Sequence, residues 1–229
     1  MGVSNIITFD AHDPRVCNAI PLSGFDDVRP AYQMIKALVR NVPDVSLDKE
    51  HLLIISPDEG AMARSMYYSS VLGVDIGMFY KRRNYSVIVN GKNPIEAHEY
   101  LGRDPKGMDV IVVDDMISSG ESMIDVARQL KARGAKRIFI FTAFGLFCNG
   151  LDVIDEAYAE GLFTRIMTTN LVYRTPELLS REWYGEVNMC KYVAYIIDTL
   201  NQDQSVSGLL DQSKRIRKLL AEHGKLVQA

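Results

Sequence analysis

The chain has 229 residues, of which 47% are hydrophobic and 24% charged, and its formal net charge is −3. These values are typical of a soluble globular protein with a sizeable core, and they give no sign of a nucleic-acid or membrane-surface partner. No apolar run approaches the roughly 18–20 residues that a transmembrane helix needs. The cysteines Cys17, Cys148 and Cys190 are widely spaced, which favours reduced thiols in the cytoplasm over a disulfide framework or a zinc site.

Apolar strands alternate with amphipathic helices along the chain. The pattern predicts strands over about 5–9, 51–56, 76–80, 109–113, 137–141 and 165–168. It predicts helices over about 28–39, 64–72, 123–130, 152–160, 176–183, 187–200 and 212–222. Residues 84–107 are polar and contain several glycines and prolines, which predicts a mobile active-site loop. This βαβα order predicts an α/β fold: a parallel, Rossmann-like sheet with helices on both faces.

The strongest functional signal is a buried strand that ends in two adjacent carboxylates, Asp114 and Asp115. Open α/β sheets bind ligands at the carboxyl ends of their strands. A short loop then opens a helix and offers small side chains, hydroxyls and backbone N–H groups from Ser118, Ser119, Gly120, Glu121 and Ser122. A helix start that can bind phosphate lies beside carboxylates that can hold hydroxyls or a metal, and this combination predicts a sugar-phosphate site. The alternative is an ordinary strand-to-helix connection in which Asp and Ser serve as turn and cap residues.

Weaker signals follow three other predicted strands. His12 is a candidate metal ligand or proton carrier, although a lone histidine is more often structural. Asp58 is a candidate magnesium ligand or a helix N-cap, and Arg64 nearby would usually be a surface residue. The basic run Lys81–Arg83 could stabilise charge in phosphoryl transfer, or it could be a solvated turn. All these positions fall at strand ends, which gather along one edge of a parallel sheet.

In combination these motifs resemble a known family. Val113-Asp-Asp-Met-Ile-Ser-Ser-Gly-Glu-Ser122 is similar to the phosphoribosyl-binding signature of type I phosphoribosyltransferase-fold proteins. Further segments narrow the resemblance to the ribose-phosphate pyrophosphokinase family: Phe9-Asp-Ala-His12, Ser56-Pro-Asp-Glu-Gly60 with Arg64, Lys81-Arg-Arg83, and Gln204-Ser-Val-Ser-Gly-Leu-Leu210. The resemblance implies transfer of diphosphate from Mg²⁺-bound ATP to ribose 5-phosphate, giving phosphoribosyl pyrophosphate and AMP for nucleotide biosynthesis.

The resemblance also implies a role for each cluster. His12 and Asp58 would contact magnesium–ATP, and Lys81 and Arg83 would stabilise the diphosphoryl group in transit. On the acceptor side, the family pattern assigns the ribose hydroxyls to Asp114 and Asp115, and the 5-phosphate to residues 118–122. The chain departs from the family pattern in this loop, where an acidic residue is usual at the position of Ser118 and a small one at the position of Glu121. A carboxylate at position 121 would repel a phosphate unless it points away or binds the metal.

In this family, the residue that matches His12 follows an N-terminal half of the same fold. We therefore expect residues 1–20 to be a remnant of that half, residues 21–184 to form the phosphoribosyltransferase-type domain, and residues 185–229 to form helices that pack on the N-terminal half or on a partner. One apolar helix face would need such a cover: Val187, Cys190, Ala194 and Ile197, with Val193 and Leu200 close beside it. This predicts a truncated chain, a homo-oligomer or a separate N-terminal-half partner.

Two other functions compete with the synthetase hypothesis. The first is a non-catalytic regulatory relative that binds ribose phosphates. The truncation, Ser118 and Glu121 favour it. The residues that argue against it are Lys81, Arg83, His12 and Asp58. The second is a phosphoribosyltransferase that consumes phosphoribosyl pyrophosphate. The basic run and the Ser-Val-Ser segment make this alternative weaker, and the sequence has no recognisable base-binding hood.

Overall fold

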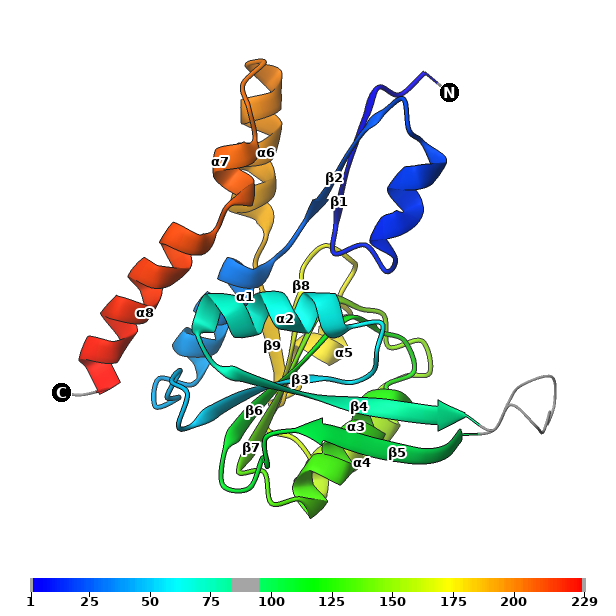
Figure 1. Ribbon diagram of the computed structural model, residues 1–229, viewed down its shortest axis with the longest axis vertical. Coiled ribbons are helices and arrows are strands. Elements are labelled where there is room, and N and C mark those ends of the chain that lie inside the picture. The colour runs from blue at the N-terminus through cyan, green and yellow to red at the C-terminus, as the bar shows by residue number, and fades with distance from the viewer. Residues whose placement is uncertain (1, 84–94, 228–229) are drawn as a thin grey trace.

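The structure, a computed structural model, describes residues 2–83 and 95–227 (Figure 1). Its strands are β1 Asn5–Phe9, β2 Gly24–Val28, β3 Leu52–Ser56, β4 Asp75–Arg83, β5 Ile95–Gly102, β6 Asp109–Ile117, β7 Arg137–Gly145, β8 Arg165–Thr169 and β9 Tyr184–Val187. Its helices are η1 Pro14–Ala19 (a 3-10 helix), α1 Ala31–Asn41, α2 Met62–Leu72, α3 Glu121–Ala132, α4 Asp152–Ala159, α5 Pro176–Leu179, α6 Cys190–Asn201, α7 Ser207–Leu210 and α8 Ser213–Val227. Among the described helices, none is long and apolar enough to cross a membrane.

The main sheet has the strand order β5-β4-β3-β6-β7-β8-β9. Its strands are parallel except for β5, which pairs antiparallel with β4 at one edge. Central strands such as β3 and β6 contain uninterrupted apolar runs, Leu52–Ile55 and Val110–Val113, because helices cover both of their faces. Helices link successive parallel strands, so the carboxyl ends of β3, β4 and β6 all reach the same edge. This confirms the predicted α/β class with a parallel sheet.

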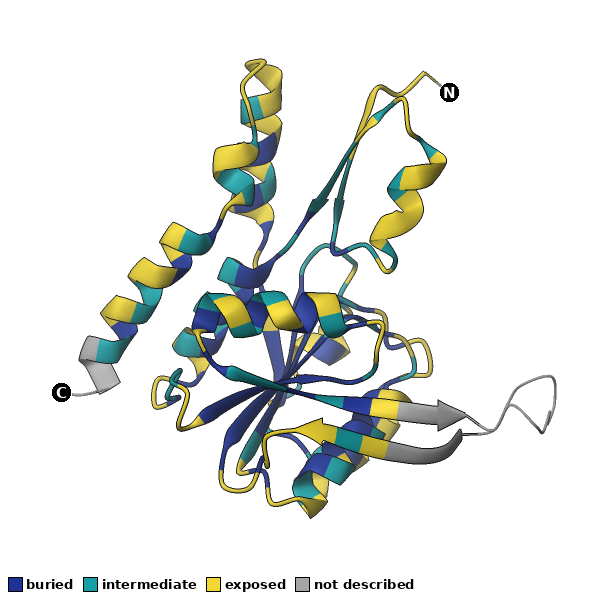
Figure 2. Cartoon of the chain, viewed as in Figure 1, coloured by how far each residue is buried: buried dark blue, intermediate teal, exposed yellow. Residues whose placement is uncertain are grey.

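The core consists of two apolar layers, one on each face of the main sheet. Successive residues of β6 alternate between them, so Val110 and Val112 pack toward α3 and α4 while Ile111 and Val113 pack toward α1 and α2. The same alternation separates Leu53 from Leu52 in β3. Burial is greatest where these strands cross the centre of the molecule (Figure 2).

A separate two-stranded sheet forms from β1 and β2, which run parallel through the connection that contains η1. The Phe9 ring at the end of β1 meets the Tyr192 ring of α6 edge-on, with centroids 6.2 Å apart. The small sheet and α6 therefore extend from the same side of the main sheet (Figure 1). This places the residues after Phe9 above the carboxyl end of β6.

Several predicted elements need correction. The segment predicted as a helix over 176–183 is helical only over Pro176–Leu179, and the helix predicted from residue 187 begins at Cys190 because β9 occupies the preceding residues. The loop predicted over 84–107 includes strand β5, and its residues 84–94 lie outside the described part of the chain. The domain boundary proposed after residue 184 falls inside β9 and stays a prediction.

The outer face of α6 is largely uncovered. Ala194 is exposed, and Ile197 and Leu200 are 61% and 43% exposed. The buried residues of this helix are instead Tyr192 and Ile196, which face the core. Val187 was predicted on this face, but it belongs to β9 and is 1% exposed. The exposed face of α6 therefore consists of Cys190, Ala194, Ile197 and Leu200, and the described chain does not cover it.

A buried ion pair fastens the amino-terminal edge of the sheet. Arg137 of β7 donates two hydrogen bonds to Asp109 of β6, at 3.0 and 2.6 Å, and a third to Asp44 at 2.8 Å. Asp109 is only 4% exposed, so its charge relies on this guanidinium. We expect Arg137→Ala to lower the free energy of unfolding in urea by about 2–3 kcal/mol.

Lys136→Ala is the matched control, because it removes a neighbouring cation that has no side-chain ion pair in the described chain. Adding Asp109→Asn to Arg137→Ala should recover part of the loss, since the buried charge is then gone. A loss for Arg137→Ala no larger than that of the control would contradict this account.

Candidate functional site

An open cavity of about 700 Å³ lies at the carboxyl ends of β1, β3, β4 and β6. It is lined by residues from all four strand ends: His12, Asp13, Pro14, Arg15, Asp58, Glu59, Gly60, Ala61, Ala63, Tyr80, Asp114, Asp115 and Met116. His12, Asp58, Asp114 and Asp115 were predicted from sequence, and the fold brings them to one cavity. Residues 118–122 are not part of its lining; they begin just beyond Met116.

Arg64 of α2 is the charged centre beneath this cavity. Its Nε donates to Asp10 Oδ1 at 2.6 Å, and one terminal nitrogen donates to the carbonyl of Ala11 at 3.2 Å. The other terminal nitrogen lies 3.6 Å from a carboxylate oxygen of Asp114 and 3.6 Å from one of Asp115. Arg64 is only 7% exposed, so the expectation of a surface residue is wrong. The helix turns this side chain inward, where carboxylates from two other elements compensate its burial.

Two of the carboxyl groups around Arg64, those of Asp10 and Asp114, have raised pKa values. Burial raises the pKa of Asp114 to about 7, and its hydrogen bond with Asp115 adds to the shift. Burial also raises the pKa of Asp10 to about 6, because the loss of hydration outweighs the attraction of Arg64. Asp10 has a positive φ of 49°, which an aspartate tolerates better than most residues and which turns the chain sharply after β1. The site is therefore a compact acidic cluster that a bound cation would stabilise in its charged form.

His12 and Asp115 form a pair across 103 residues of sequence. The Nδ1 atom of His12 lies 3.0 Å from Asp115 Oδ2. The histidine side chain is 79% exposed whereas that of Asp115 is 4% exposed. A buried carboxylate thus orients a ring that faces the cavity, an arrangement in which the ring can bind a metal or carry a proton.

Asp58 stabilises the turn between β3 and α2. Its Oδ1 atom accepts a hydrogen bond from the Ala61 amide at 3.2 Å, and its carbonyl accepts one from Ser56 Oγ at 2.7 Å. A Cβ atom on Gly60 would lie 3.3 Å from Asp58 Oδ1, so a larger residue at position 60 would press on this carboxylate. The capping role is therefore present, and a role in metal binding stays a prediction.

The loop after β6 adopts the geometry expected at a helix start. Gly120, the N-cap of α3, has a φ of 89°, and a Cβ atom there would lie 3.1 Å from Ile154 Cδ1. The N-cap residue is a glycine and makes no side-chain cap hydrogen bond, so it does not satisfy the first backbone N–H groups of α3. Glu121 and Ser122 are exposed, and the Ser118 carbonyl accepts from the Cys148 amide at 2.9 Å.

Lys81 and Arg83 belong to the last residues of β4, where the backbone pairs with β5. Their side chains lie outside what the structure describes, so their catalytic role stays a prediction. Tyr80, the preceding residue, lines the cavity and is 37% exposed. Neither Tyr80 nor Glu59 was singled out from sequence as a site residue, because each lies beside a more conspicuous charged motif.

In the described part of the chain, no group of three or more His, Cys, Asp or Glu residues is arranged to hold a metal ion. Magnesium commonly binds through one or two carboxylates together with substrate phosphates and water. The oxygen-rich lining, with Asp58, Glu59, Asp114 and Asp115, fits such a partly substrate-held ion. The site supplies the hard oxygen donors that magnesium prefers without forming a complete protein cage.

Residues 25–161 match the family described as the phosphoribosyl transferase domain, and the chain belongs to this family. Its curated relatives are ribose-phosphate pyrophosphokinases, as the motifs indicated. The proteins from Ureaplasma parvum and Thermococcus kodakarensis are 27% and 30% identical over 76% of this chain, and the alignments cover 50% and 58% of those proteins. That of Vibrio parahaemolyticus is 26% identical over 92% of this chain and 62% of its own length. The chain thus spans about half to three-fifths of the length of these relatives.

A crystal structure of phosphoribosylpyrophosphate synthetase from Mycobacterium smegmatis shares the fold. The two chains align with a TM-score of 0.71 and 19% identity, over 88% of this chain and 60% of the other. The predicted resemblance and the phosphoribosyltransferase-type fold are therefore confirmed.

The raised pKa of Asp114 makes stability depend on pH. Between its unfolded pKa of 3.8 and its folded value of about 7, the native state binds more protons than the unfolded state, so stability falls as pH rises. An asparagine does not titrate, so we expect Asp114→Asn to remove this loss. The change that the substitution causes in the free energy of unfolding should therefore be more stabilising at pH 8 than at pH 4, by roughly 2–3 kcal/mol.

Urea denaturation at both pH values measures the difference, with the exposed Asp104→Asn as the matched control. Because the pKa of Asp10 is also raised, a smaller pH dependence of stability should remain in every variant. Equal effects of Asp114→Asn at pH 4 and pH 8 would refute the assignment.

Proposed function

We propose that this chain carries the substrate site of a ribose-phosphate diphosphokinase, which transfers diphosphate from Mg²⁺-bound ATP to ribose 5-phosphate. The observation that carries the proposal is the meeting of Asp114, Asp115, His12 and Asp58 on one cavity, with a helix start directly beyond it. The family match supports a site for a phosphoribosyl group, and the names of the relatives support this reaction. Activity, substrates and partners were assigned to proteins longer than this chain, and here they are part of the proposal.

On the acceptor side, Asp114 and Asp115 would accept hydrogen bonds from the ribose hydroxyls. The uncapped start of α3 would bind the 5-phosphate, because its N–H groups and dipole favour an anion. Glu121 is exposed in this first turn and can point to solvent, away from the phosphate. The sugar would thus lie between a carboxylate pair and a helix N-terminus.

On the donor side, His12 and Asp58 would hold the magnesium ion that accompanies ATP, and that ion would neutralise phosphate charge. The 1-hydroxyl oxygen of ribose 5-phosphate forms a bond to the β-phosphorus of ATP, the bond from that phosphorus to the α,β-bridging oxygen breaks, and AMP leaves. The hydroxyl proton is released. Lys81 and Arg83, at the end of β4, would stabilise the charge on the transferring group. Most of the rate enhancement would come from positioning and charge stabilisation.

The test is direct. We expect the chain, incubated with magnesium, ATP and ribose 5-phosphate, to form AMP and phosphoribosyl pyrophosphate in equal amounts. Asp115→Asn should lower the rate, whereas Asp104→Asn at the opposite edge of the sheet should not. If ribose 5-phosphate binds by calorimetry but no AMP forms, the chain is a ribose-phosphate-binding relative and the enzyme proposal fails.

A second measurement tests the role of the basic strand end. We expect Lys81→Ala to lower kcat roughly 10²- to 10³-fold while the KM for ribose 5-phosphate changes little, because the cation acts on charge that develops in the transition state. Lys106→Ala, an exposed lysine before β6, is the control. Equal losses in kcat and in ribose 5-phosphate affinity would count against a transition-state role.

The predicted cytoplasmic location and homo-oligomer, and the alternative of a separate N-terminal-half partner, stay predictions. The uncovered face of α6 is compatible with each kind of partner.

A further inference from the structure

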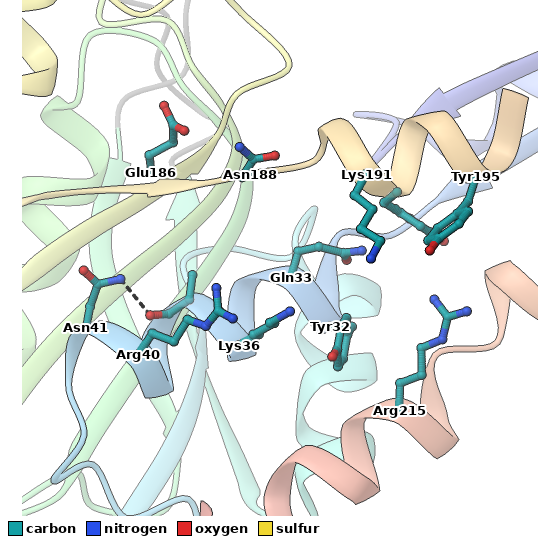
Figure 3. Close-up of a pocket in the computed structure, with 12 residues that line it drawn as sticks. Tyr32, Gln33, Lys36, Arg40, Asn41, Glu186, Asn188, Lys191, Tyr195 and Arg215 are labelled. Atoms are coloured by element: carbon teal, nitrogen blue, oxygen red, sulfur yellow. Dashed lines mark hydrogen bonds between the residues drawn. The ribbon is translucent and has the colours of Figure 1, made fainter.

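A second cavity, of about 550 Å³, lies between α1, α8 and the junction of β9 with α6 (Figure 3). It shares no lining residue with the cavity described above. Its volume is within the roughly 300–1,000 Å³ typical of small-molecule sites. Neither the proposed reaction nor any motif noted in the sequence accounts for it.

Four cations from three helices line this cavity. Lys36 and Arg40 lie one turn apart on α1, Lys191 lies in the first turn of α6, and Arg215 extends from α8 (Figure 3). Across the described part of the chain, none of the four has a carboxylate within ion-pairing distance. The chain as a whole carries a net charge of −3, so this basic cluster runs against the overall balance.

The acidic residue in the lining does not neutralise the cluster. Glu186 lines the cavity, but its carboxylate is held by Arg174, whose Nε lies 3.1 Å from Glu186 Oε2. Arg174 itself is not part of the lining. The cavity therefore keeps an excess of positive charge, and gathering like charges without a counter-ion is unfavourable unless an anion compensates them.

The walls of the cavity are tied to one another by the buried side chain of Gln212, at the start of α8. Its Oε1 atom accepts a hydrogen bond from the Tyr32 amide at 2.7 Å, and its Nε2 atom donates to the Arg29 carbonyl at 2.6 Å. The same Nε2 atom lies 3.0 Å from the Tyr192 hydroxyl of α6. One amide thus joins all three helices, so the cations are presented on a connected frame and their spacing is fixed by the fold.

The remaining lining suits a ligand that also has a neutral part. Tyr32 and Tyr195 place two rings at the cavity, and Tyr195 is 45% exposed. Gln33 Oε1 is buried and has no hydrogen-bond partner in the described chain, which leaves one acceptor unsatisfied at this wall. Asn188 adds a polar side chain before the first turn of α6, whose dipole favours an anion.

We propose that this cavity between α1, α6 and α8 is a binding site for a small di- or triphosphate anion, either a nucleoside polyphosphate or inorganic polyphosphate. The four cations, which have no carboxylate partner in the described chain, bind the phosphate chain, and in the nucleoside form the base packs against the tyrosine rings. A ligand with a single phosphate would leave much of the positive charge uncompensated. The site is independent of the proposed reaction.

Calorimetric titrations of the full chain with ADP and with tripolyphosphate, at low salt and without magnesium, test the proposal. The double variant Lys36→Gln/Arg215→Gln should weaken binding of both ligands at least about tenfold, since each cation makes charge-assisted contacts with phosphate. Lys214→Gln/Arg217→Gln removes the same charge from α8 residues outside the lining and should bind as the unaltered chain does.

Equal affinity of the two double variants, or no binding to the unaltered chain up to millimolar ligand, would overturn the proposal. The variant Tyr195→Leu, which removes one of the rings, distinguishes a site for a nucleoside polyphosphate from a site for inorganic polyphosphate. Weaker binding of ADP with unchanged binding of tripolyphosphate assigns the site to a nucleoside polyphosphate, and unchanged binding of both assigns it to inorganic polyphosphate. Because the diphosphokinase assay measures AMP formation at a different cavity, failure of either proposal is distinguishable from failure of the other.

Discussion

The buried guanidinium of Arg64 is the contact on which the acidic cavity depends. It lies 2.6 Å from Asp10 and 3.6 Å from both Asp114 and Asp115, so one cation serves three carboxylates that come from two strand ends. Without it, the end of β1 and the end of β6 would repel each other. With it, they lie side by side but keep an excess of negative charge. Burial is the main cause of the raised pKa values of Asp10 and Asp114, and neighbouring carboxylates add to it. A magnesium ion or ribose hydroxyl donors would stabilise the charged forms.

The parallel sheet is the second feature on which the acidic cavity depends. Since β3, β4 and β6 run in the same direction, their polar carboxyl ends collect at one edge while their apolar residues fill both faces of the core. The small β1–β2 sheet then brings His12 over the same edge, where Asp115 orients its ring. The two cavities thus differ in charge: carboxylates predominate in the lining at the strand ends, and cations predominate in the lining between α1, α6 and α8.

Prediction from sequence was most successful where the signal was local. The apolar run of β6, its terminal Asp114 and Asp115 and the glycine that opens α3 were all readable, because hydrophobic pattern and backbone conformation depend on adjacent residues. Short polar strands were missed. Val28, where the helix predicted over 28–39 was to begin, ends strand β2, and α1 starts only at Ala31. Asp27 of β2 accepts a hydrogen bond from the Ala11 amide at 2.8 Å. An isolated strand of this composition has no periodicity strong enough to reveal its pairing.

The sequence by itself determined that strands alternate with helices, the α/β class, and the placing of Asp58, Asp114 and His12 at strand ends. Only the tertiary structure decided that Arg64 is buried, that His12 pairs with a residue 103 positions away, and that cations from three helices share one cavity. The physical reason is that strand and helix patterns are set by neighbouring residues. Desolvation and charge pairing, in contrast, depend on which distant segments pack together, and no local pattern encodes that.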